Sequence, residues 1–421
     1  MFLGILEGDY RSYARFIGMY SGRMFTFVSG RSSAPSLTKF KTMYKTTGLK
    51  NSRIEVADAL RGLAVIGIIL YHSVEHFNLF SPNVSASLPI DGVLFNVLTV
   101  LLSGKMYGIF ALLFGLSFFI MRDNQEQKGK DFSLRFAWRM VLLFGFGLIN
   151  LCLYNGDILT FYAILGLLMI PAGYLSTPLL LGITLFLLIQ PIEIYSLISG
   201  WKPDMSGLYE GYMKMGQANG EGTFLESAAA GVKYGFTASL AWFLDKGRIT
   251  QTLGLFYLGI IIGRLRLFYN EGNHLKLWRI VCAISATAVA CGIIFGNRSA
   301  GDVSFGDLDK LIHPLFNLAI LLLIVSAVVL CWYAFEGFRK SLSHVCFFGR
   351  MSLTNYIMSS FFGALVFYGW GFGLYKVLGT TWSFLVGIAI VVTQIVLLYQ
   401  WSKHHERGPL ETLWRKLTWI W

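Results

Sequence analysis

The sequence predicts an all-α polytopic membrane protein, a bundle of about ten transmembrane helices with both termini in the cytoplasm. Of its 421 residues, 55% are hydrophobic and only 14% are charged, whereas a soluble domain carries about a quarter charged residues. Its longest apolar runs reach the roughly 20 residues that cross a bilayer as a helix. Composition and run length together therefore exclude an ordinary soluble domain.

Ten apolar runs are expected to span the membrane. They lie near residues 58–79, 106–121, 136–154, 157–174, 178–199, 249–268, 278–295, 311–334, 352–375 and 382–401. A shorter run at 93–104 is expected to form an interfacial or re-entrant helix before the second span. Gly104, Gly108 and Gly115 lie beside or within that span and are expected to allow close helix packing.

The domain organisation follows from these runs. Residues 53–401 are expected to form the transmembrane bundle, and 402–421 a cytoplasmic tail that lies on the inner leaflet as an interfacial helix. Residues 1–52 are expected to form a basic cytoplasmic tail without a cleavable signal peptide, with Met43 as an alternative start. The near-neutral segment 200–248 is the one sizeable loop outside the membrane, either a lid over an outward-facing cleft or a plain connector.

Loop charge predicts the orientation of the bundle. Basic residues cluster before the first span and after the second, sixth, eighth and tenth, whereas the intervening loops are acidic, neutral or mixed. Positive charge marks cytoplasmic loops, so we expect a multi-pass protein of the bacterial inner membrane. The same asymmetry accounts for the net charge of +12. The expected partner is therefore the lipid bilayer and no nucleic acid, while a homo-oligomer is left open.

The first span carries a polar stripe. At 100° per residue, His72 lies about 20° from Arg61 around the helix and about 16 Å further along it. Asp58 and His76 each lie about 60° from Arg61, on the same stripe. Charged groups within a span normally face the bundle interior or a wet cavity. The alternatives are an ion pair of Asp58 and Arg61 that anchors the helix near the headgroups, and a hydrogen-bonded helix contact for His72.

The segment from His72 to His76 also matches the short His-x-x-Glu-His motif of inverted zincins. No distal acidic ligand is evident, and the motif lies at the end of a membrane helix. Glu75 and His76 are therefore expected to form an interfacial polar cap, and no metal is expected. The five cysteines show no Cys-x-x-Cys spacing, so they are interpreted as small hydrophobic residues.

Polar residues and glycines punctuate the last part of the chain beside two apolar spans. The segments are Gly349-Arg350-Met351-Ser352-Leu353-Thr354-Asn355-Tyr356, Tyr368-Gly369-Trp370-Gly371-Phe372-Gly373-Leu374 and Arg407-Gly408-Pro409-Leu410-Glu411-Thr412-Leu413-Trp414-Arg415. Ser352 is expected to cap the ninth span. Asn355 is expected to make an interhelical hydrogen bond or to contact a ligand that enters from the cytoplasm. The pattern resembles the carboxy-terminal domain of the YeiB-like integral membrane proteins, which implies such a domain at 250–401.

The loop Tyr154-Asn155-Gly156-Asp157-Ile158-Leu159-Thr160 resembles a Gly-Asp-Ile-Leu signature of the same family. In that family a histidine usually precedes the signature, and Asn150 stands near its place here. Asp157 has two readings of equal weight. It caps the fourth span, or its carboxylate orients His72 or binds acceptor hydroxyls at the outer mouth.

The opening Arg53-x-x-x-x-Asp58-x-x-Arg61-Gly62 is also similar to the first helix of type-3 membrane acyltransferases and heparan glucosaminide acetyltransferases. This resemblance implies transfer of an acyl group from cytosolic acyl-CoA to an acceptor on the far side, with a membrane histidine involved. His72 is the matching position, although many YeiB-like sequences have asparagine there. A neutral imidazole suits the role of general base.

The function expected from the sequence is therefore an integral membrane acyltransferase, with acyl-CoA as donor and a small molecule or glycan as acceptor. Its catalytic residues are expected to be His72 and Asp157, and its substrate-binding residues Asp58, Arg61, Arg350 and Asn355. The alternative is a transporter or exporter of a small amphipathic metabolite that uses the polar stripe as its path. A partner-binding membrane scaffold is a third reading.

Overall fold

The structure is a computed structural model, and it describes residues 53–79, 85–201, 204–245, 247–269, 274–295, 297–299, 302–304 and 308–420. The predicted tail 1–52 lies outside these ranges, so neither its role nor the alternative start at Met43 is addressed by the structure. Everything below concerns the helical bundle that begins at Arg53.

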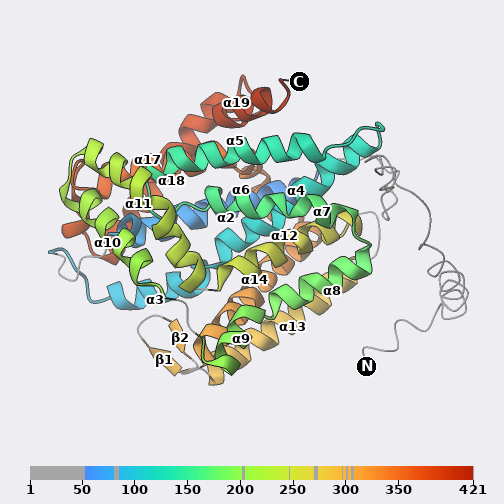
Figure 1. Cartoon of the computed structure of the whole chain (residues 1–421), viewed down its shortest axis with the longest axis horizontal. Helices are drawn as coiled ribbons and strands as arrows, with labels where there is room; N and C mark the ends of the chain where they lie inside the picture. Colours follow the sequence, from blue (N-terminus) through green and yellow to red (C-terminus); the bar gives the residue numbers. More distant parts are fainter. Residues whose placement is uncertain are drawn as a thin grey trace, which may run out of the picture. The chain divides into compact units, whose positions relative to one another are not determined.

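The described chain is helical apart from one small hairpin (Figure 1). Its first half contains α2 (Glu55–Val74), η2 (His76–Asn78), α3 (Asp91–Leu102), α4 (Lys105–Glu126), α5 (Ser133–Leu151), α6 (Leu159–Leu167), α7 (Met169–Tyr174), α8 (Thr177–Leu188), α9 (Pro191–Ser199), α10 (Ser206–Glu221) and α11 (Phe224–Asp245). Its second half contains α12 (Arg248–Arg264), α13 (His274–Phe295), α14 (Asp309–Ala334), α15 (Glu336–Ser343), α16 (Cys346–Arg350), α17 (Ser352–Phe367), η4 (Leu374–Lys376), α18 (Thr380–Ser402) and α19 (Pro409–Thr418). The antiparallel hairpin pairs β1 (Asn297–Ser299) with β2 (Asp302–Ser304).

Six helical stretches in the described ranges are long and apolar enough to cross a membrane. They are α2, the continuous pair α3–α4, α5, α13, α14 and α18. The pair α8–α9, bent by 46°, makes a seventh if it counts as one span. The other expected spans also fold as helices, but α12 and α17 are short and the fourth breaks into α6 and α7. The predicted all-α polytopic membrane bundle is thus confirmed.

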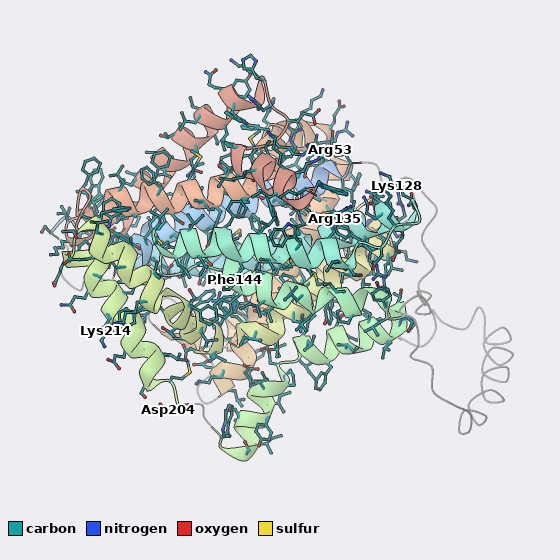
Figure 2. All side chains as sticks on the ribbon, turned by 45° about the horizontal axis from the view of Figure 1, so that its top comes forward. Arg53, Lys128, Arg135, Phe144, Asp204 and Lys214 are labelled. Carbon is teal, nitrogen blue, oxygen red and sulfur yellow. The ribbon has the colours of Figure 1, made fainter. Side chains whose placement is uncertain are left out.

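Loop charge divides the bundle into two ends. Figure 2 shows Arg53, Lys128 and Arg135 at one end, with Asp204 and Lys214 toward the opposite end. The first end carries the basic loops that the positive-inside rule assigns to the cytoplasm. The C-terminal end of α2 and the helices α10 and α11 belong to the opposite end (Figure 1). The two ends are called cytoplasmic and outer below, as that rule would assign them.

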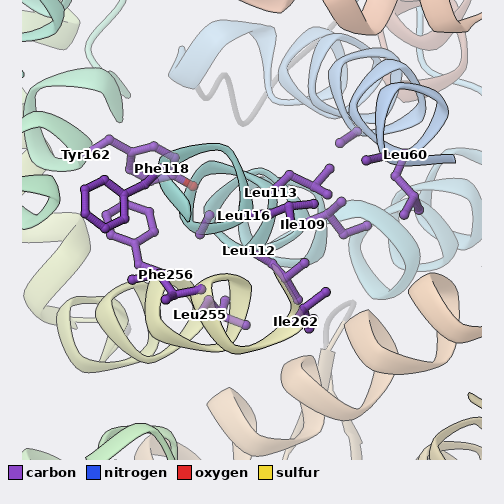
Figure 3. Close-up of a cluster of buried hydrophobic side chains, with 14 of the residues drawn as sticks. Leu60, Ile109, Leu112, Leu113, Leu116, Phe118, Tyr162, Leu255, Phe256 and Ile262 are labelled. Atoms are coloured by element: carbon purple, nitrogen blue, oxygen red, sulfur yellow. The ribbon is translucent and has the colours of Figure 1, made fainter. Parts of the chain in front are cut away.

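The centre of the bundle is the contact of α4 with α12, flanked by α2 (Figure 3). Leu60, Leu112, Leu116 and Leu255 are fully buried there. A β-carbon on Gly115 would overlap the carbonyl oxygen of Phe256. In α12, a β-carbon on Gly259 would overlap the carbonyl oxygen of Leu112. The two backbones touch at this crossing, which confirms the packing role predicted for Gly115.

The carboxy-terminal helix α19 is docked on the bundle. The Glu411 carboxylate accepts hydrogen bonds from the backbone N–H groups of Leu353 (2.7 Å) and Thr354 (3.0 Å) and from the Thr354 hydroxyl (2.6 Å). In return, the Leu410 N–H donates to the Thr354 hydroxyl at 3.1 Å. Each helix therefore satisfies orphan donors at the start of the other.

This reciprocal capping corrects one expectation. Ser352 makes no capping hydrogen bond for α17, because Glu411 from α19 supplies the acceptor. The helix α19 is also held on α5, since the Trp414 indole N–H donates to the Arg139 carbonyl at 3.1 Å and its ring lies 3.6 Å from the Arg139 guanidinium. The segment 407–415 thus joins α17 to α5.

Replacing Glu411 with alanine is expected to lower the free energy of unfolding by about 1–3 kcal/mol, because three donors lose their acceptor. The matched control is Glu336→Ala, since Glu336 is 66% exposed and pairs with Lys340 on the surface of α15. That change is expected to cost less than about 1 kcal/mol. The comparison needs thermal unfolding of both variants in an uncharged detergent. Equal unfolding midpoints for the two variants would contradict the capping role.

Candidate functional site

A polar cavity of about 70 Å³ lies at the outer end of α2, large enough for several water molecules. Segments far apart in the sequence form it: α2, the junction of α3 and α4, the loop 154–158, α10, α11, α12 and α17. Its polar lining consists of Tyr71, His72, Glu75, Asn78, Ser103, Tyr107, Tyr154, Asn155, Tyr212, Trp242, Arg248 and Tyr356. A water-sized space with this many polar groups is the default candidate for a binding site in the bundle.

The predicted extracytoplasmic segment 200–248 forms part of this cavity. It folds into α10 and α11, which contribute Tyr212, Ala238 and Trp242 to the wall. The Ser239 hydroxyl donates to the Asn155 carbonyl at 3.0 Å, so α11 is tied to the loop that carries Tyr154. The helices α10 and α11 thus form a wall of the cavity, which a plain connector would not do.

His72 lies in the cavity with two partners at its Nδ1 atom. The Tyr154 hydroxyl is 2.9 Å from Nδ1, and the Glu75 carboxylate is 3.5 Å from it. Tyr154 is buried and also accepts a hydrogen bond from the Asn78 amide at 3.1 Å. The Tyr154 hydroxyl also lies 3.5 Å from Nε2, so Tyr154 contacts the ring edge between its two nitrogens while Glu75 approaches Nδ1.

Glu75 and His76 do not form the expected interfacial cap. Glu75 lies in the cavity wall with its side chain 16% exposed. The helix α2 ends at Val74, and His76 has a positive φ of 50°, so the helical stripe does not continue to His76. Its Nε2 instead lies 2.8 Å from the Ser383 hydroxyl of α18. Among the described residues, no group of three His, Cys, Asp or Glu side chains is placed to hold a metal ion.

Asp157 is buried behind the cavity and is not among its lining residues. One carboxylate oxygen accepts from the Thr160 N–H and hydroxyl, each at 2.9 Å, and the other accepts from the Asn150 amide at 3.0 Å. The geometry is that of a helix cap for α6, and Asn150 holds the carboxylate where the family pattern has histidine.

An apolar cavity of about 80 Å³ adjoins the polar one. It shares Ile68, Ile158 and Tyr356 with the polar cavity. From this junction it extends toward the cytoplasmic end of the bundle, where Ser352, Leu353 and Trp414 line it. Its remaining lining is Phe110, Phe114, Leu143, Leu159 and Tyr162. The docked helix α19 therefore contributes to the cytoplasmic end of this cavity through Trp414.

Four charged residues gather at the cytoplasmic end of α2. The Asp58 carboxylate pairs with Arg53 at 2.8 Å and with Arg61 at 2.6 Å. Arg350 contributes a third guanidinium, and burial together with the neighbouring Arg53 charge lowers its pKa. The Arg350 Nε atom is buried and has no hydrogen-bond partner in the described part of the chain. Beside these four residues, Glu406 acts on Arg350 and Glu55 acts together with Asp58 on nearby Cys346, so acidic groups offset the three guanidinium charges.

Asn355 lies outside both cavity walls. It is fully buried, and its amide donates to the Phe348 carbonyl at 2.9 Å. It therefore links α17 to the short helix α16 in front of it. Of the predicted site residues, His72 is the one that lies in the polar cavity, whereas Asp58, Arg61 and Arg350 form the cytoplasmic cluster.

Sequence reasoning did not single out Tyr154, Tyr107, Trp242 or Arg248 as site residues. A signal existed for two of them. Tyr154 directly precedes the Asn155-Gly156-Asp157 segment, and Arg248 follows Asp245 and Lys246 at the start of an apolar run, where a charge can mark either the end of a span or a site inside it. For Tyr107 and Trp242 no local pattern separates a cavity aromatic from a packing aromatic.

The fold and these cavities define a polytopic helical membrane protein with a polar cavity inside its outer half. Residues 262–421 match the family described as "Protein of unknown function (DUF418)". The chain is 27% identical over 401 residues to uncharacterized protein YxaH of Bacillus subtilis (strain 168), covering 88% of this chain and 96% of that protein. It is 25% identical over 391 residues to uncharacterized protein YeiB of Escherichia coli (strain K12), covering 86% and 95%. The predicted resemblance to YeiB-like proteins is confirmed, whereas that to acyltransferases stays a prediction. No solved structure matches the chain.

Proposed function

We propose that this protein is a membrane acyltransferase of the bacterial inner membrane. It moves an acyl group from cytosolic acyl-CoA to a small-molecule or glycan acceptor on the outer side. The observation that carries the proposal is the junction of the two cavities. An apolar cavity that extends toward the cytoplasmic end lies beside a polar cavity that contains His72, and the two share Ile68, Ile158 and Tyr356 as their common wall.

The cytoplasmic cluster supplies the donor site. Guanidinium groups bind phosphate oxygens through paired N–H donors, and Arg350 has a buried nitrogen without a partner. Arg350 precedes Ser352 by two residues, and Ser352 lines the apolar cavity. The CoA phosphates would bind at Arg61 and Arg350, and the acyl chain would extend along the apolar cavity toward the junction.

The chemistry at the junction is a base-assisted transfer. His72 Nε2 takes the proton from the acceptor hydroxyl or amine while that oxygen or nitrogen attacks the thioester carbonyl carbon. The carbon–sulfur bond breaks, and the CoA sulfur leaves as a thiolate that takes up the proton from His72. Glu75 and Tyr154 hold the imidazole through Nδ1. Acyl-CoA and acceptor thus become acylated acceptor and free CoA.

The donor site is tested by binding of a medium-chain acyl-CoA to the purified protein in an uncharged detergent. Saturable binding is expected, with an affinity about tenfold or more lower in Arg350→Gln because a charge-assisted contact to phosphate is lost. The control Arg279→Gln removes an exposed arginine on α13 and is expected to bind as the wild type does. Absence of saturable binding in folded protein would contradict the proposal, and substrate flux in liposomes would then test the transporter alternative.

A further inference from the structure

Arg248 is a buried cation in the polar cavity that the proposed transfer does not use. It begins α12, lines the cavity and is 5% exposed. It forms no ion pair within the described residues. Its Nη1 atom is buried without a hydrogen-bond partner there. A buried charge is costly unless an opposite charge or hydrogen bonds compensate it.

Aromatic rings hold this guanidinium in place without neutralising it. Its carbon lies 3.6 Å from the ring centre of Trp242 and 4.6 Å from that of Tyr107. The Tyr107 hydroxyl donates to Gln251 at 2.8 Å, and the Gln251 amide donates to the Pro314 carbonyl at 2.7 Å. The rings are therefore fixed by a network of their own. Tyr107 also makes a side-chain hydrogen bond to the guanidinium, and Glu75 is the carboxylate that acts on it across the cavity. The donor left for a ligand is Nη1, which has no partner among the described residues.

The backbone leaves room beside the guanidinium. Gly104 adopts a left-handed conformation with φ of 76°, and it also lines the cavity. A β-carbon there would lie 3.4 Å from Arg248 Nη2 and 3.3 Å from the Asn317 amide nitrogen. The turn between α3 and α4 thus needs glycine for its conformation, and the same residue keeps space open at the arginine.

We propose that Arg248, held against Trp242 and Tyr107, binds an oxyanion of the ligand in the polar cavity, either a carboxylate or a phosphate. A planar guanidinium with free N–H donors matches these groups in charge and geometry. Resting on the proposed function, this inference makes the acyl acceptor an anionic molecule whose charged end binds at Arg248 while its hydroxyl or amine faces His72.

The test measures anion binding by the full chain in an uncharged detergent. The thermal unfolding midpoint is followed while sodium phosphate or sodium acetate replaces sodium chloride at constant ionic strength. In a second arm, phosphatidylglycerol or uncharged monoacylglycerol is added to the micelles. A ligand that binds the folded state raises the midpoint in a saturable way. Saturation by a soluble anion indicates a soluble acceptor, and saturation by phosphatidylglycerol alone indicates a lipid-borne one.

The wild type and the control Arg279→Gln are expected to show the same saturable stabilisation. Arg248→Gln is expected to need at least about tenfold more anion. If Arg248→Gln does not fold, Arg248→Lys keeps the charge but loses the two-pronged geometry, and it is expected to bind several-fold more weakly. Equal stabilisation of the wild type and the folded Arg248 variant would overturn the proposal. So would the absence of saturable stabilisation by every anion in wild-type protein.

Failure of the oxyanion-site proposal and failure of the acyltransferase proposal give different results. His72→Asn is expected to leave the anion titration unchanged, because the contacts of His72 in the described part of the chain are with Tyr71, Glu75, Phe77 and Tyr154 and do not include Arg248. Anion binding without acyl-CoA binding would support the oxyanion site and contradict the acyltransferase. Acyl-CoA binding without an Arg248-dependent anion effect would support the acyltransferase and contradict the oxyanion site.

Discussion

Replacing Gly259 with leucine is expected to prevent the bundle from folding. The α12 backbone at Gly259 lies against the Leu112 carbonyl of α4, and Gly115 lies against the Phe256 carbonyl in the same crossing. A side chain at Gly259 meets backbone atoms, which cannot move aside as the end of a flexible side chain can. The two helices would have to separate along the fully buried core of Leu112, Leu116 and Leu255.

Inserting one methylene into a packed core already costs about 1–3 kcal/mol, so a leucine that separates two backbones is expected to cost more than about 4 kcal/mol. The matched control is Gly145→Leu in α5, because a β-carbon there meets nothing within 4 Å. That variant is expected to fold normally and to gain a little helix propensity. The measurement is the yield of monodisperse protein in detergent. A normal yield of Gly259→Leu would refute the proposed backbone contact.

The fold class was predictable because it depends on local properties. Apolar run length and loop charge report on each helix separately, and each expected span is helical in the structure. The packing role of Gly115 was predictable for the same reason, since a small residue inside a span has few other uses. Breaks within a span were harder to predict from the sequence. The break of the fourth span into α6 and α7 at Leu168 leaves no mark in hydropathy.

Contacts between distant segments could not be predicted from one sequence. Nothing in the segment around Glu411 indicates its partner, yet its carboxylate caps α17, more than fifty residues earlier in the chain. Asn355 was expected either to bond between helices or to contact a ligand, and its burial against Phe348 follows only from the packing of α16. Local periodicity carries no information on which partner a polar side chain meets.

In the candidate site, too, the local feature was predictable and the contacts from distant segments were not. His72 was identified from its place on the polar stripe, and it lies in the cavity. Its partners were not identified, because the helical stripe was continued through His76 although α2 ends at Val74. The reversal of the backbone at His76, Phe77 and Asn78, all with positive φ, turns His76 toward α18. Tyr154 reaches His72 from another loop altogether.

If His72 is the general base, His72→Asn is expected to lower acyl turnover by about 10²–10⁴-fold, the usual contribution of a positioned acid or base. Asparagine is the appropriate replacement because its amide keeps a hydrogen-bonding group toward Tyr154 and Glu75 but cannot accept a proton at neutral pH. The variant should therefore fold and bind acyl-CoA as the wild type does. The loss is expected in turnover alone, because the donor site at Arg61 and Arg350 lies at the other end of α2.

Turnover is measured as release of the CoA thiol with a chromogenic thiol reagent, first to water and then to candidate acceptors. His404→Asn is the control, because His404 is exposed after α18 and lines neither cavity. Tyr154→Phe separates positioning from proton transfer. It removes the hydroxyl 2.9 Å from Nδ1 but leaves the imidazole, so a smaller loss than in His72→Asn is expected. Full turnover in folded His72→Asn would show that His72 is only a helix contact. The cavity would then need another base, and Glu75 is the remaining carboxylate in its wall.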